Sequence, residues 1–112
     1  MPADRPPRSR VPVRRSAAPS PDPAAARRTL GAVLRAFRKA HPDDPSIDRL
    51  AEWADLHRNY VGSAERGERN VAFVALTRWL AALGVSWAEF GEAVDRQFAL
   101  EPQTSRAGSR GS

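Results

Sequence analysis

The fold is decided by the stretch His57-Arg58-Asn59-Tyr60-Val61-Gly62-Ser63-Ala64-Glu65-Arg66-Gly67-Glu68-Arg69-Asn70. It begins with a polar residue able to cap a helix, and Gly67 is the residue type that most often follows a helix end. One face carries small or apolar residues, Val61 and Ala64, and the other carries Arg58, Asn59, Gly62 and Ser63. The pattern predicts a short helix with one packed and one polar face. Arg and Asn on such a face can read base edges in a DNA major groove.

A second short helix is predicted directly before this one. Ser46 is a capping residue, and Leu50, Ala51 and Ala54 face inward after it. The stretch 55–57 is long enough only for a tight turn, so the two helices form a helix-turn-helix. Ala51 lies where the two helices would cross, and a close crossing requires a small residue.

The first helix of the chain is predicted from its two ends and its apolar stripe. Asp22 is a capping carboxylate, and Pro23 suits the first helical position. The helix should end near His41, because Pro42 disfavours helix in the residue before it. The inward-facing residues are Leu30, Val33, Leu34 and Phe37.

Two further helices are predicted after residue 70. The start of the fourth is expected to be fixed by tertiary packing or by Asn70, and the helix ends at Gly84. The fifth begins with the capping box from Ser86 to Glu89 and runs to about Phe98. Their apolar stripes are Phe73, Leu76, Leu80 and Leu83, with Trp79 beside them, and Phe90, Val94 and Phe98, with Trp87 near them.

The ends of the chain differ in composition from its centre. Residues 1–21 are rich in Pro and Arg, and we expect a disordered basic arm there; the alternative is an arm that contacts DNA. Residues 22–99 form the predicted domain, and residues 100–112 form a second disordered tail. The net charge of +5 comes from these tails, because positions 30–95 hold eight basic and ten acidic residues. A DNA footprint on the domain must therefore be a local patch.

Composition argues against several classes of protein. There are no cysteines, so the chain has no disulfide and no thiolate metal site. No apolar run approaches the roughly 20 residues that span a bilayer, and the arginine-rich start lacks the apolar core of a secretory signal. No nucleophile–base pair and no phosphate-binding glycine loop is present, so we expect neither an enzyme nor a cofactor.

His41-Pro42-Asp43 matches the signature tripeptide of J-domain co-chaperones. Here it lies between the first helix and a small acidic helix, so we favour a chance match. Asp44 and Asp48 add carboxylates nearby, but no metal-ligand spacing joins these residues, and a solvated acidic loop is expected with no metal.

The sequence resembles the Xre/Cro-type helix-turn-helix family, whose domain is lambda-repressor-like, over roughly residues 30–90. The matching residues are Leu30-Gly31, Leu34, Arg38, Leu50-Ala51, Tyr60-Val61, Glu65-Arg66-Gly67, Arg69-Asn70, Leu76 and Leu80-Ala81-Ala82-Leu83-Gly84-Val85. Within that family, the stretch from His57 to Val71 looks most like the small controller proteins of restriction–modification systems.

The resemblance implies a cytoplasmic, bacterial transcription regulator that binds a near-palindromic operator in double-stranded DNA as a homodimer. By position, base edges would be read by Arg58, Asn59 and Ser63. The DNA backbone would be held by Tyr60, Arg69, Asn70 and the helix start at Ile47. Arg38 and Glu65 match positions where the family often forms an ion pair between the first and third helices, and we read them as structural.

One residue departs from the family pattern, and one helix is too apolar for a small core. Ile47 stands where the family commonly has a Gln that clamps a phosphate, so only the backbone N–H remains there to bind a phosphate.

The fifth helix is expected to face a second copy of the chain through Trp87, Phe90 and Val94. The alternative function is an antitoxin or interaction module that uses the same fold with a protein partner, a toxin or another regulator.

Overall fold

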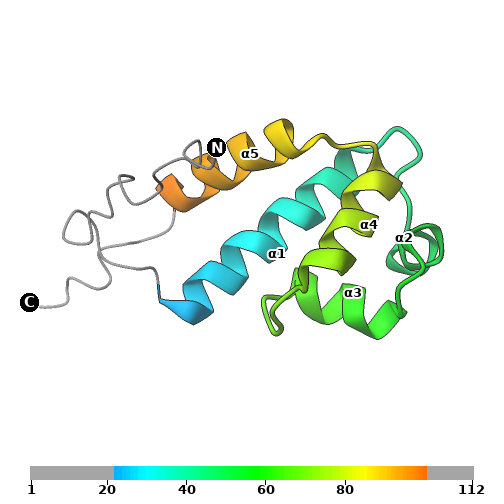
Figure 1. Ribbon diagram of the computed structural model, residues 1–112, viewed down its shortest axis with the longest axis horizontal. Helices are drawn as coiled ribbons and strands as arrows, with labels where there is room; N and C mark the ends of the chain where they lie inside the picture. The colour runs from blue at the N-terminus through cyan, green and yellow to red at the C-terminus, as the bar shows by residue number, and fades with distance from the viewer. Residues whose placement is uncertain (1–21, 101–112) are drawn as a thin grey trace, which may run out of the picture.

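The computed structural model describes residues 22–100, which form five helices and, within this range, no strand (Figure 1). The helices are α1 (Pro23–Ala40), α2 (Ile47–Ala54), α3 (Arg58–Glu65), α4 (Phe73–Leu83) and α5 (Trp87–Leu100). The predicted all-α, five-helix fold is confirmed, and α5 continues two residues past its predicted end. The segments 1–21 and 101–112, where we expect disordered tails, lie outside the described residues.

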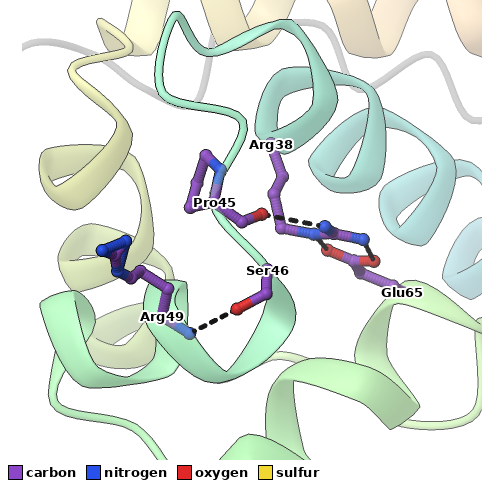
Figure 2. Close-up of polar contacts among 5 residues, drawn as sticks. All are labelled: Arg38, Pro45, Ser46, Arg49 and Glu65. Carbon is purple, nitrogen blue, oxygen red and sulfur yellow. Dashed lines mark hydrogen bonds and ion pairs between the residues drawn. The ribbon is translucent and has the colours of Figure 1, made fainter.

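The predicted helix caps account for most of these boundaries. The Asp22 carboxylate accepts a hydrogen bond of 3.2 Å from the N–H of Ala25. The Ser46 hydroxyl accepts one of 3.0 Å from the N–H of Arg49 (Figure 2). In the capping box, Ser86 Oγ accepts from the N–H of Glu89 at 3.0 Å, and Glu89 Oε1 accepts from the N–H of Ser86 at 2.9 Å. Each bond satisfies a donor that the helix start leaves without an intrahelical partner.

Helix α1 is the central element of the fold (Figure 1). Helix α5 packs along one side of it and α3 against another, while α2 contacts both α3 and α4. The core between them is apolar and includes Trp79, which has no exposed surface. Its other buried side chains are Val33, Leu34, Leu50, Ala51, Val61, Ala64, Leu80, Leu83 and Phe90. The core thus holds α3 by its inner face alone.

Helices α1 and α3 pack closely together at Gly31. A Cβ atom at this position would lie 2.5 Å from the carbonyl oxygen of Ala64 and 2.6 Å from that of Glu65. No real side chain fits at such distances, so the crossing requires glycine. Ala51 of α2 is buried, as the sequence predicts.

Candidate nucleic-acid interface

Helices α2 and α3 are joined by the tight turn that the sequence predicts. Asp55 ends α2 in the left-handed conformation, with φ of 58°, and the N–H of Leu56 donates to the carbonyl of Ala51 at 2.9 Å. His57 then caps α3, because its Nδ1 accepts a hydrogen bond of 3.1 Å from the N–H of Asn59. The turn therefore holds the first residues of α3 at the surface.

The two faces of α3 have the predicted character. Val61 and Ala64 are buried, whereas Arg58 and Asn59, side by side in the first turn, are exposed. A guanidinium and an amide at such positions offer paired donors and acceptors to a base edge.

Gly62 differs from its expected exposure. It is buried, and Nη1 of Arg66 lies 3.3 Å from the place a Cβ atom would occupy. Arg66 therefore covers the middle of the outer face of α3, one turn after Gly62. Its Nε also donates to Glu68 Oε2 at 3.1 Å, and this contact raises the pKa of Arg66 and lowers that of Glu68. Arg66 follows Gly62 by four residues, which places both on the same face of α3. This spacing is the sequence signal that indicates Arg66 as a further residue of the site.

Arg58 has one hydrogen-bonding partner within the described residues, Asp48. Its Nη1 lies 3.4 Å from both carboxylate oxygens of Asp48, which is the second residue of α2. Both side chains are about two-thirds exposed, with relative accessibilities of 65% and 66%. The contact spans a groove of about 480 Å³ between α2 and the start of α3.

Three residues expected to touch DNA form one cluster across α3 and the loop after it. Arg69 Nε donates to Ser63 Oγ at 2.7 Å, and its guanidinium lies 4.8 Å from the centre of the Tyr60 ring. The Ser63 hydroxyl in turn donates to the carbonyl of Tyr60 at 3.2 Å. The cluster brings Arg69 back over the outer face of α3, so a residue from the following loop extends the surface of the helix.

The two remaining backbone candidates differ in exposure. Asn70 is exposed beside Arg69, in the loop between α3 and α4. Ile47 begins α2, and its side chain is half-buried against the core. An isoleucine packed inward leaves only the backbone N–H of the helix start to meet a phosphate.

Arg38 and Glu65 form a two-pronged ion pair between α1 and α3 (Figure 2). Arg38 Nε and Nη2 donate to the two carboxylate oxygens at 2.8 and 2.9 Å, and Nη1 donates to the carbonyl of Pro45 at 3.0 Å. The pair is almost fully buried, and the bond to Glu65 raises the pKa of Arg38. Arg38 thus fixes the end of α3 and the loop before α2 to α1 at once.

The two histidines have structural roles in the described chain. His41 Nδ1 accepts from the N–H of Asp43 at 3.0 Å, in the turn between α1 and α2, and His57 caps α3. Between residues 22 and 100, no three His, Cys, Asp or Glu side chains gather as metal ligands. No helix in that range is long and apolar enough to span a bilayer.

Known proteins similar to this chain are regulators. No family model matches it. The control protein C.MunI of a Mycoplasma species is 34% identical over 68 residues, which cover 61% of this chain and 90% of that protein. The chain belongs to the Xre/Cro-type helix-turn-helix family of transcription regulators. A second relative in this family, the control protein C.SmaI of Serratia marcescens, is 40% identical over 57 residues, which cover 51% of this chain and 66% of that protein.

Solved structures agree with this family assignment. Two structures of the clp gene regulator ClgR of Corynebacterium glutamicum are similar to the chain. One is 31% identical with a TM-score of 0.60 and covers 71% of this chain and 96% of that one. The other is 28% identical with a TM-score of 0.65 and covers 81% and 92%. This Xre/Cro-type protein is a DNA-binding transcription regulator, and its relatives are regulators rather than enzymes, as expected.

The face expected to meet a second copy is only partly open in this Xre/Cro-type domain. Phe90 is 8% exposed and belongs to the core, because α5 turns it toward the rest of the domain. Trp87 is 47% exposed and stacks on Phe73, with ring centres 5.5 Å apart. Val94 is half-buried. The open apolar surface at this end is therefore the Phe73–Trp87 stack, with the neighbouring Val74.

Proposed function

We propose that this regulator reads a near-palindromic operator in the major groove as a homodimer. The observation that carries the proposal is the first turn of α3, where Arg58 and Asn59 lie side by side and exposed. An arginine can bond guanine O6 and N7 together, and an asparagine can do the same with adenine N6 and N7. Ser63 would be the third base reader on this face, once its hydroxyl exchanges the hydrogen bond from Arg69 for one to a base.

Backbone contacts would surround the reading residues. Arg69 and Asn70 lie in the loop after α3, and the backbone N–H of Ile47 lies at the start of α2. Tyr60 contacts Arg69 through its ring, so the two would approach the same strand together. Such contacts set the register of a protein on the duplex without reading its sequence.

The dimer would form through the exposed aromatic stack. Phe73 is 70% and Trp87 47% exposed, and two adjoining aromatic rings left in water favour burial against another surface. Val94 would extend the contact along α5, and Phe90 would support it from beneath, since Trp87 meets Phe90 edge-to-face at 5.8 Å. A two-fold dimer presents two recognition helices about one turn of DNA apart, and this geometry matches a palindrome.

The domain proposed to do this is residues 22–99, flanked by segments 1–21 and 100–112. Its place of action would be the cytoplasm, where the DNA of a bacterial cell lies.

Selection from a pool of random duplexes, followed by sequencing of the bound fraction, tests the proposal. We expect an enriched inverted repeat whose half-sites are centred about one helical turn apart. Fluorescence anisotropy on the enriched duplex at two salt concentrations then measures affinity, and sedimentation velocity measures the oligomeric state. Weak, salt-sensitive binding without enrichment would contradict the proposal and favour a protein partner.

A further inference from the structure

Asp48 stands beside the main proposed base reader. Asp48 is the second residue of α2 and Arg58 the first of α3, so the helix-turn-helix itself brings them together. Both carboxylate oxygens lie 3.4 Å from the same guanidinium nitrogen, Nη1. The contact therefore engages one corner of the guanidinium fork. In residues 22–100, no partner is seen on its other edge, formed by Nε and Nη2.

The edge left open is suited to a base. Nε and Nη2 of an arginine carry two parallel N–H groups, which match two adjacent acceptors such as O6 and N7 of guanine. The contact with Asp48 orients the Arg58 side chain. Because an exposed ion pair of this kind is weak, it does not prevent the guanidinium from binding a base. Asp48 thus aims Arg58 while leaving its reading edge available.

The charge of Asp48 also separates two kinds of DNA contact. A phosphate carries a full negative charge, so a carboxylate beside Arg58 offsets much of the attraction between the guanidinium and a phosphate. The edge of guanine is a neutral pair of acceptors, and the same carboxylate repels it far less. Arg58 paired with Asp48 is therefore a poorer phosphate binder than a lone arginine, yet remains a guanine reader.

We propose that Asp48 is a specificity-determining residue that positions Arg58 for a guanine edge and keeps it from phosphates. The inference rests on the proposed function, since it assigns a role to the proposed base reader. Asp48 itself need not touch DNA; it acts through Arg58.

The test compares wild-type protein with Asp48→Asn, which removes the charge and keeps the size. The full chain is titrated by fluorescence anisotropy against the selected operator and against a scrambled duplex of equal length, at two salt concentrations. We expect Asp48→Asn to bind the scrambled duplex more tightly, so that the ratio of the two affinities falls by about threefold or more. Glu92→Gln, the same charge change at an exposed position of α5, should leave that ratio unchanged.

An Arg58→Ala background separates positioning from simple repulsion. If Asp48 acts through Arg58, Asp48→Asn has no effect on the affinity ratio once Arg58 is absent. The same drop in both backgrounds would mean that Asp48 changes the affinity ratio without acting through Arg58, and would overturn the inference. If the wild type selects its operator but Asp48→Asn leaves the ratio of the two affinities unchanged, the inference about Asp48 is overturned and the proposed function stands. A wild type that selects no sequence overturns the proposed function and the inference with it.

Discussion

The phenolic oxygen of Tyr60, in α3, accepts a hydrogen bond of 2.9 Å from the backbone N–H of Ala72, before α4. Ala72 occupies the N-cap position of α4 but supplies no side-chain cap of its own. In a capping box, the glutamate side chain accepts a hydrogen bond from the N–H of the N-cap residue. At the start of α4, the Tyr60 hydroxyl accepts this bond instead. Tyr60 therefore joins α3 to the start of α4, and this tertiary contact fixes that start.

Tyr60→Phe tests this link, because it keeps the ring under Arg69 and removes only the hydroxyl. We expect the free energy of unfolding to fall by about 0.5–1.5 kcal/mol, the usual cost of one such hydrogen bond. Urea denaturation followed by tryptophan fluorescence measures it. Thr77→Val is the comparison, since its hydroxyl bonds only to a carbonyl one turn earlier in the same helix. An equal loss in both variants would remove the special role of Tyr60.

Arg58→Ala and Arg69→Ala should weaken DNA binding in different ways. Loss of Arg58 should cost about 1–3 kcal/mol and relax the preference for one base in each half-site. Loss of Arg69 should weaken all duplexes alike and reduce the salt slope by about one. Competition titrations with single-base operator variants, repeated at two salt concentrations, separate the two patterns. Uniform weakening by Arg58→Ala would show that it binds backbone rather than bases.

Glu65→Ala should destabilise the domain far more than Glu68→Ala. Removing Glu65 leaves the buried Arg38 charge without its partner, at a cost of about 3–5 kcal/mol. Glu68 pairs with Arg66 at an exposed position, where water replaces the contact at little cost. The midpoints of urea denaturation compare the two. Similar midpoints for both variants would mean that the loss of Glu65 does not leave a costly unpaired charge at Arg38.

Trp87→Glu and Phe90→Glu should separate assembly from folding. Trp87 is half exposed, so a charge there should give folded monomers with unchanged circular dichroism. Phe90 is in the core, so a charge there should unfold the domain instead. Sedimentation velocity with circular dichroism of each variant checks both outcomes. A Trp87→Glu protein that still sediments as a dimer would place the interface elsewhere.

Local signals in the sequence predict the frame of this fold well. Asp22, Ser46 and the box from Ser86 to Glu89 each make the capping bond that their residue types indicate. Such bonds join residues three apart, so a short window contains both partners. The same holds for the apolar stripe of α1, whose spacing alone shows which face is packed.

Features that depend on how the helices pack together are what the sequence could not predict. Trp87 and Phe90 lie three residues apart on one stripe, and only the packing of α5 in the fold decides which of them stays open. The bond from Ala72 to Tyr60 joins residues twelve apart and has no periodicity that could reveal it.

The close approach at Gly31 has a consequence for how such a regulator can change its target. Gly31 and the Arg38–Glu65 pair hold α3 from its inner side, and neither uses Arg58, Asn59 or Ser63. The proposed base-reading residues and these two attachments are thus separate sets of residues. New operators become reachable by exchanging outer residues one at a time, while the scaffold beneath them stays as it is.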